Sequence, residues 1–188
     1  LGLPMGIALV ITAPKGLRPN KIIYKILDVI VNIVRSIPFL ILLIMIIPLT
    51  RIIVGKSYGP TATIVPLTLA PFIARMVESS LLEVDHGVIE AAQSMGANLW
   101  TIIWKVMLAE SRTSLLVNAT IALGTILGYS AMAGAVGGGG LGDIAIRYGY
   151  YRYQTDIMLV TVVLLVLLVQ LLQYIGMTIS KKLDKRTR

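Results

Sequence analysis

The stretch VIEAAQSMGANLWTIIWKVMLAES, residues 88–111, lies between two long apolar segments and is itself too polar to cross a membrane. Residues 88–95 favour a helix, and Gly96 then allows the left-handed turn that ends a helix at little cost. Asn98 is placed to cap a second helix. The apolar residues of that second helix share one face: Leu99, Ile102, Ile103 and Val106. The pattern predicts a helix–glycine–helix elbow held between membrane-spanning helices.

The outer surface of this elbow is a first candidate for a functional surface. Glu90 is followed by Ala91 and Ala92, and such small side chains let another protein approach closely. The same pattern is compatible with a cytoplasmic loop that packs only on its own helix bundle. The residues alone leave both interpretations open.

Composition indicates a helical membrane protein. Of the 188 residues, 56% are hydrophobic, and cysteine is absent, which excludes disulfides, thiol catalysis and thiolate metal sites. The net charge of +8 does not point to nucleic acid, because the basic residues cluster at the ends of apolar segments, as membrane topology requires. His86 is the single histidine and has no partner at metal-ligand spacing, so we expect no metal site.

Apolar stretches near the roughly 20 residues that span a bilayer predict an all-α, polytopic bundle of about five spans. We expect one transmembrane domain over residues 1–188, with spans at 1–12, 22–49, 61–82, 113–136 and 157–180 and the elbow in a loop at 83–112. Because the chain opens on Leu1 with a short apolar run, we expect 1–12 to be the second half of a first span rather than a signal peptide. Arg75 and Glu78 are interpreted as an interfacial ion pair.

The orientation follows from the basic tail. Positive charge favours the cytoplasmic side, and the last residues carry five basic side chains: Lys181, Lys182, Lys185, Arg186 and Arg188. The C-terminus is therefore expected in the cytoplasm. Alternation then places residues 137–156 outside, 88–111 inside, 51–60 outside and 12–21 inside.

The glycine-rich segment after residue 136 fits two catalytic motifs only in part. Gly137, Gly139 and Gly142 have the spacing of a dinucleotide fingerprint, but that motif must follow a strand, and here it follows a membrane span. Gly140-Leu141-Gly142-Asp143 resembles a motif of intramembrane aspartyl proteases, whose chemistry needs a second aspartate to share a proton. The chain has no Tyr-Asp pair, so we expect no catalytic residue.

Two pairs of small residues mark the span at 113–136. Gly124 with Gly128, and Gly134 with Gly138, are four residues apart, which lets helix backbones approach closely. The approach can occur within one bundle or between two copies of the chain. Both interpretations stay open.

Ser130 and Met132 are the candidate pathway or gate residues. Methionine is flexible and polarisable, and Met132 falls in the outer half of its span by the topology above. Two copies meeting near a dimer axis would form an apolar constriction. Ordinary core packing is the alternative.

The elbow resembles the signature loop of bacterial ABC importer permeases, which reads Glu-Ala-Ala, three residues, Gly, then a distal Ile-x-Leu-Pro. The matching positions are Glu90, Ala91, Ala92, Gly96 and Leu108, while Val106 and Ala109 replace the usual Ile and Pro. Other segments resemble the methionine-importing branch of that family: Arg35-Ser36-Ile37-Pro38-Phe39, 64–68, 71–78, 128–132 and the glycine-rich 137–150.

The resemblance implies a homodimeric permease in the bacterial cytoplasmic (inner) membrane, surrounded by lipid and bound to two ATPase subunits. It further implies an extracytoplasmic methionine-binding lipoprotein as supplier, and methionine translocation by alternating access. The chain has no Gly-x-x-x-x-Gly-Lys-Ser/Thr, so ATP and Mg²⁺ are assigned to the partner, and this chain is expected to hold no cofactor and to be no enzyme. The family's usual five-span subunit has residues preceding the position of Leu1.

A channel or ion-gradient-driven secondary transporter for a small polar solute is the alternative. Such a protein needs a broken-helix or charged site near the membrane centre. Pro66 and Pro71 permit a broken helix. The elbow argues against this alternative, because a gradient-driven carrier needs no surface for an ATPase.

Overall fold

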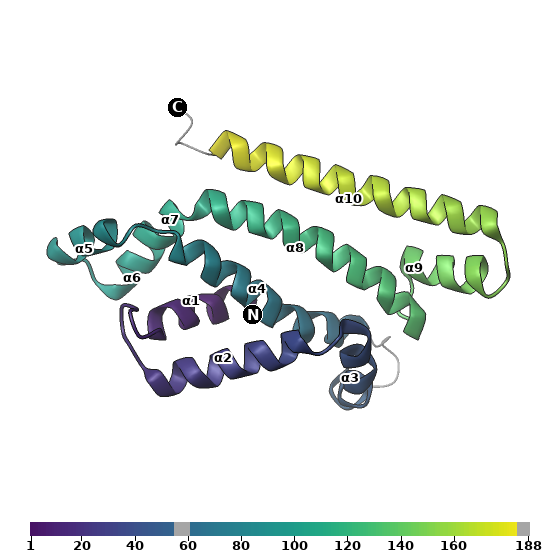
Figure 1. Cartoon of the computed structure of the whole chain (residues 1–188), viewed down its shortest axis with the longest axis horizontal. Coiled ribbons are helices and arrows are strands. Elements are labelled where there is room, and N and C mark those ends of the chain that lie inside the picture. Colours follow the sequence, from purple (N-terminus) through teal and green to yellow (C-terminus); the bar gives the residue numbers. More distant parts are fainter. Residues whose placement is uncertain (55–60, 184–188) are drawn as a thin grey trace. The chain divides into compact units, whose positions relative to one another are not determined.

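The computed structural model describes residues 1–54 and 61–183, and of residues 50, 54 and 61–68 only the backbone (Figure 1). The described residues form helices and no strand, which confirms the all-α prediction. The elements are α1 (Gly2–Thr12), α2 (Lys21–Ser36), α3 (Phe39–Val54), α4 (Thr61–Leu82), α5 (His86–Ser94), α6 (Leu99–Thr101), the π-helix η1 (Ile102–Met107), α7 (Leu108–Glu110), α8 (Arg112–Ala133), the 3₁₀ turn η2 (Gly134–Val136), α9 (Gly140–Ile144), the π-helix η3 (Ala145–Tyr150) and α10 (Thr155–Leu183). Most of the predicted connection at 51–60, and Lys185, Arg186 and Arg188 of the tail, lie outside the described residues.

The chain divides into two compact units. The elbow unit comprises Leu1–Asn32, Ala70–Thr120 and Gly176–Arg188, and the hairpin unit comprises Ile33–Leu69 and Ile121–Ile175. Each is described by itself below.

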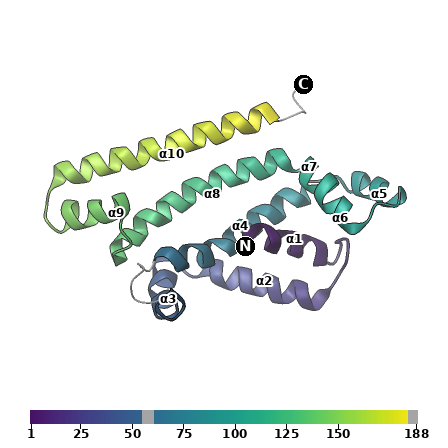
Figure 2. The same cartoon turned by 180° about the vertical axis from the view of Figure 1, so that it is seen from behind.

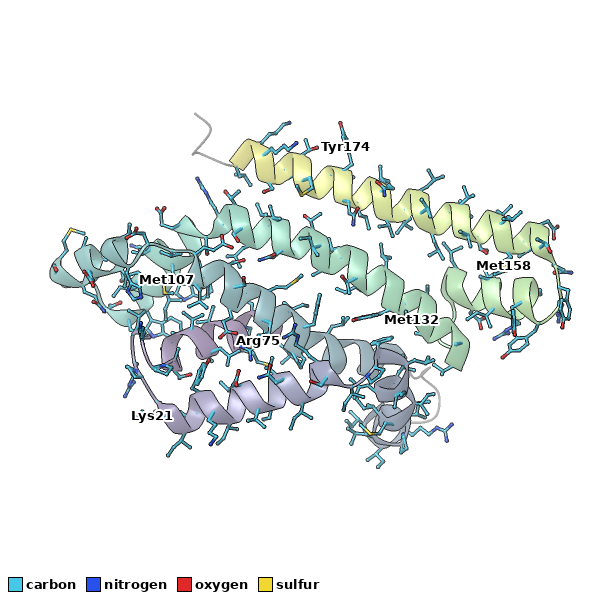
Figure 3. All side chains as sticks on the ribbon, in the orientation of Figure 1. Lys21, Arg75, Met107, Met132, Met158 and Tyr174 are labelled. Carbon is cyan, nitrogen blue, oxygen red and sulfur yellow. The ribbon has the colours of Figure 1, made fainter. Side chains whose placement is uncertain are left out.

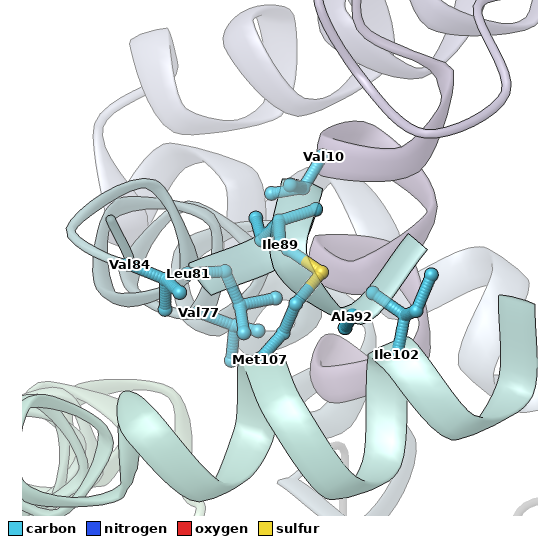
Figure 4. Packing of buried hydrophobic residues seen from close by; sticks show 8 residues of the cluster. All are labelled: Val10, Val77, Leu81, Val84, Ile89, Ala92, Ile102 and Met107. Atoms are coloured by element: carbon cyan, nitrogen blue, oxygen red, sulfur yellow. The ribbon is translucent and has the colours of Figure 1, made fainter. Parts of the chain in front are cut away.

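The core of the elbow unit joins the elbow to α1 and α4 (Figure 4). Met107 lies at its centre with 3% of its surface exposed, beside Ile89 of α5. The other buried members come from these elements and from the turn between α4 and α5: Val10, Val77, Leu81, Val84, Ala92 and Ile102. Burying a side chain of the size of Met or Ile stabilises a fold by about 1.5–3 kcal/mol. The elbow is therefore an integral part of this unit.

Two glycines set the approach of α1 to α4. A Cβ on Gly6 would lie 2.6 Å from the Cβ of Val77, and one on Gly2 would overlap Ile73. Because Gly2 and Gly6 are four residues apart, they share one face of α1, and their missing side chains let the two backbones pack closely. This contact was not among the sequence predictions.

An ion cluster ties α2 to α4 within the elbow unit (Figure 3 labels Arg75). Arg75 Nη1 donates to Glu78 Oε2 at 2.6 Å, and Nη2 donates to Asn32 Oδ1 at 2.9 Å and to Asp28. Glu78 is 6% exposed. The predicted Arg75–Glu78 pair is confirmed, and the structure adds Asp28 of α2 as a second carboxylate.

The expected span at 22–49 is broken into two helices. A sharp bend separates α2 from α3 at Ile37 and Pro38, so the pair is either one broken span or a re-entrant turn. Proline lacks an N–H and disfavours helical geometry in the residue before it, which explains the break. Among the described residues, the stretches 112–136 and 155–183 are long and apolar enough to cross a membrane alone. The crossings expected at 1–12 and 61–82, where α1 and α4 lie, stay predictions.

The hairpin unit contains a helix where the sequence predicts a connection at 137–156. After α8 the chain turns at Gly137, Gly139 and Gly140, whose φ angles are +77°, +75° and +83°, and α9 then packs against the end of α8 (Figures 1 and 2). Positive φ favours glycine, which explains the glycine-rich sequence. A Cβ on Gly142 would overlap the backbone of Ala131. We call α9 and η3 the fold-back.

Candidate functional site

The first helix of the elbow, α5, has a well-defined structure at both ends. Asp85 Oδ1 accepts a hydrogen bond of 2.6 Å from the Gly87 N–H at the start of α5. At the other end Gly96 has φ +77°, which confirms the predicted left-handed turn. A Cβ on Gly96 would meet nothing within 4 Å. Glycine is needed here for its backbone conformation and not for space.

The second arm of the elbow starts as predicted and continues differently. Asn98 Oδ1 accepts from the Thr101 N–H at 2.8 Å, so Asn98 is the N-cap. The arm is a short α-helix followed by the π-helix η1, whereas the sequence predicts one α-helix. A π-helix carries extra residues per turn. Ile102, Ile103 and Met107 are consequently the buried residues of this arm, while Leu99 and Val106 are half-buried.

The structure separates the signature residues into two groups. Glu90 and Ala91 are exposed, whereas Ala92 is 5% exposed and packs in the core with Ile89. Leu108 is half-buried and packs against the same core. The exposed surface of α5 therefore includes Glu90 and Ala91, whereas Ala92 and Leu108 pack in the core of the elbow unit.

Three large apolar residues of the elbow are also exposed and were not among the predicted site residues. Met95 is 81% exposed, Trp100 is 68% exposed and Trp104 is 55% exposed. A large apolar side chain left in solvent marks a candidate contact surface. The sequence carries a signal for the tryptophans, since four-residue spacing places Trp100 and Trp104 on one side of the arm.

The four glycines predicted for packing meet different neighbours. A Cβ on Gly124 would lie 2.9 Å from Gln173 Nε2 of α10, and one on Gly134 would overlap the backbone of Asp143 in the fold-back. The Gly138 N–H donates to the Ala133 carbonyl at 2.9 Å. Gly128 has nothing within 4 Å of an added Cβ. Gly128 lines a hollow whose other wall is formed by residues of α10: Leu165, Val166, Val169 and Gln170.

The two predicted pathway residues do not share a face. Met132 is 49% exposed, and Ser130 is also exposed (Figure 3 labels Met132). Residues two positions apart on an α-helix point about 200° apart. If α8 lines a pathway, only one of these two side chains can face it. Met132 is half-exposed, so it is not a core residue of this chain.

A polar network in the elbow unit went unrecognised in the sequence. Asn118 Nδ2 donates to Ser80 Oγ at 2.7 Å and to the Met76 carbonyl at 3.2 Å, and Ser114 Oγ donates to Ser80 Oγ at 3.1 Å. Ser80 is fully buried. Polar side chains that bond across helices hold apolar bundles together. The network fixes the start of α8 against α4.

Comparison with known proteins gives consistent matches. The family described as binding-protein-dependent transport system inner membrane component matches residues 2–188. The probable D-methionine transport system permease protein MetI of Vibrio cholerae is 53% identical over 188 residues, covering 99% of this chain and 84% of that protein. The methionine import system permease protein MetP of Bacillus subtilis is 43% identical over 180 residues, covering 95% and 81% respectively.

Solved structures agree with these matches. A chain from an inward-facing conformation of the MetNI methionine ABC transporter has a TM-score of 0.93 at 51% identity, and the match covers 98% of this chain and 87% of that chain. A chain from a crystal structure of an amino acid ABC transporter with histidines has a TM-score of 0.75 at 18% identity, covering 96% and 85%. The second match shows a shared fold.

Proposed function

The chain belongs to the family of binding-protein-dependent transport system inner membrane components, and from this premise we propose that it is the permease subunit of an ABC importer for methionine. The family is one of transport permeases, which are multi-pass inner-membrane proteins and not catalytic enzymes. The relative that is 53% identical is a probable D-methionine transport permease. That identity over nearly the whole chain is the observation that carries the choice of substrate.

The geometry of the elbow supports a docking role toward two ATPase subunits. Glu90 and Ala91 are exposed on one short, capped helix, Met95 is exposed directly after it, and Ile89 and Ala92 of the same helix are buried in the core. A helix held this way presents its outer face in a fixed geometry, as transmission of movement requires. In this proposal the partner ATPase uses ATP and Mg²⁺, and the membrane-spanning helices of this chain move in response.

The proposed mechanism is alternating access in a homodimer that receives methionine from an extracytoplasmic binding lipoprotein. The half-exposed Met132 supports a second copy meeting this part of α8. An apolar constriction made by two Met132 side chains excludes water and ions. Ser130 points to another side of α8, so it does not line this constriction. The C-terminus lies in the cytoplasm in this proposal.

Uptake of labelled methionine into vesicles that hold the complete complex tests the proposal. We expect uptake that requires ATP and the binding protein and that persists when ion gradients are collapsed. Uptake that stops with the ion gradient and continues without the ATPase would instead support the secondary-transporter alternative. Uptake of other amino acids with methionine excluded would overturn the substrate.

A further inference from the structure

A cavity of about 510 Å³ lies in the elbow unit where α7 meets α8. Its volume falls within the range of small-molecule sites, about 300–1,000 Å³. Three charged side chains line it: Glu83, Glu110 and Arg112. Val84, Val117 and Leu183 supply an apolar part of the wall. The cavity therefore combines both signs of charge with apolar surface.

The charges of this cavity are available to a ligand. Among the described residues, the ion pairs are Arg75 with Asp28 and Glu78, and Arg147 with Asp143. Within the described part of the chain, neither Glu83 nor Glu110 forms an ion pair with Arg112. Two acidic groups and one basic group give the wall a net negative charge, which disfavours a purely anionic ligand.

Rigid elements hold the wall. Asn118 lines the cavity and is fixed by its bonds to Ser80 Oγ and to the Met76 carbonyl. Arg112 opens the 22-residue helix α8, whose first N–H groups and dipole also favour a negative group. A carboxylate therefore has its most favourable position at Arg112, and an ammonium group has its most favourable positions at Glu83 and Glu110.

We propose that this cavity receives an amino-acid zwitterion. Its carboxylate faces Arg112, its ammonium group faces Glu83 or Glu110, and its side chain contacts Val117 and Leu183. This inference rests on the proposed function and deepens it, because it assigns a substrate site to this chain. Since Glu110 ends α7 and Arg112 begins α8, an occupant touches both sides of the joint between the elbow and the following span.

The absence of cysteine permits a local test in the assembled complex. Val117→Cys places one thiol in the permease, and a water-soluble thiol reagent reports its accessibility through labelling of that subunit. With methionine at ten times its Kd, mass action predicts about tenfold slower labelling. Asp156→Cys, exposed in the hairpin unit, is the matched control, and methionine should leave its labelling rate unchanged.

Charge variants in the Val117→Cys background assign the two ends of the ligand. Arg112→Gln, and Glu83→Gln combined with Glu110→Gln, should each raise the methionine concentration for half-protection by about tenfold or more, because a charged hydrogen bond is lost. Lys181→Gln removes an exposed charge that does not line the cavity and should leave the midpoint unchanged. N-acetylmethionine and methionine methyl ester, which each keep one charge, should protect at least about tenfold more weakly than methionine.

Several results would overturn the inference. These are an unreactive Val117→Cys without methionine, equal protection by a singly charged analogue, or unchanged midpoints in correctly assembled charge variants. Uptake separates this inference from the proposed function. ATP-driven methionine uptake without protection of Val117→Cys removes only the cavity assignment, whereas protection without uptake removes the proposed function.

Discussion

The elbow and the fold-back both depend on glycines, and Gly96 of the elbow and Gly142 of the fold-back are needed for different reasons. Gly96 has φ +77° and open space where a Cβ would be, so glycine is needed there for the backbone conformation. A Cβ on Gly142 would overlap the backbone of Ala131, so glycine is needed there to let α9 pack closely against α8. A conformational glycine shows in a local sequence pattern, whereas a contact glycine depends on a segment elsewhere in the chain.

The largest expected effect follows from filling the contact at Gly142. Gly142→Val forces α9 away from α8, and overpacking costs about 1–3 kcal/mol, with the upper end expected here because the added atoms meet backbone. Thermal unfolding of the purified complex should show a large loss of stability. Ala135→Val is the control, because it adds methyl groups at an exposed position of the same unit. A Gly142→Val complex that unfolds at the wild-type temperature would contradict the packed fold-back.

At Gly96 the expected effect is smaller in stability and larger in transport. A side chain at positive φ costs about 1–2 kcal/mol, which lowers the population of the native turn by about 5- to 30-fold if the arm is free to adopt another conformation. Gly96→Val should reduce ATP-driven uptake while the bundle stays folded. Gly96→Asn should retain more uptake, since asparagine tolerates this conformation better. Full uptake and normal ATPase binding in Gly96→Val would count against docking through the elbow.

Removing the cap of the second arm tests the elbow without changing its turn. Asn98→Ala leaves the Thr101 N–H without its side-chain acceptor, and loss of an N-cap costs about 1 kcal/mol. We expect the melting temperature to fall by about 2–4 °C in a protein of this size. Asn98→Asp keeps an acceptor and should remain near wild type. Equal losses in both variants would mean that the amide has another role.

The smallest expected change in stability is at Met132, and there the readout is a leak. Met132 is 49% exposed, so truncation should cost about 1 kcal/mol, less than for a fully buried methionine. Met132→Ala should speed passive methionine efflux from proteoliposomes without ATP. Met158→Ala is the matched control, because Met158 is 41% exposed and contacts Gly149 of the fold-back. Equal efflux from the two variants would leave Met132 as a packing residue.

The features that the sequence predicted correctly are local ones. The turn at Gly96 and the cap at Asn98 each depend on residues within a few positions, where backbone preferences act directly. The helix at 61–82 also has the predicted bounds. The pair of Arg75 with Glu78 was visible because its members lie three residues apart.

The features that were missed depend on distant partners. In the sequence Ala92 is one of two adjacent small residues, and only the structure shows that it packs in the core with Ile89 and Met107. Asp28 joins Arg75 across 47 residues of sequence, which no local pattern reveals. The fold-back looked like a loop because glycine has poor intrinsic helix propensity, and contact with α8 and α10 overrides that preference.

The shared core of the elbow and α4 has a mechanical consequence. Ile89 and Met107 of the elbow are in the same close-packed cluster as Val77 and Leu81 of α4, and close-packed interiors have low compressibility and transmit strain. A displacement of α5 should therefore be passed to α4 through these buried side chains. Arg75 of α4 is in turn paired with Asp28, so α4 is linked directly to α2. Force applied at α5 thus reaches two long helices without a flexible hinge in between.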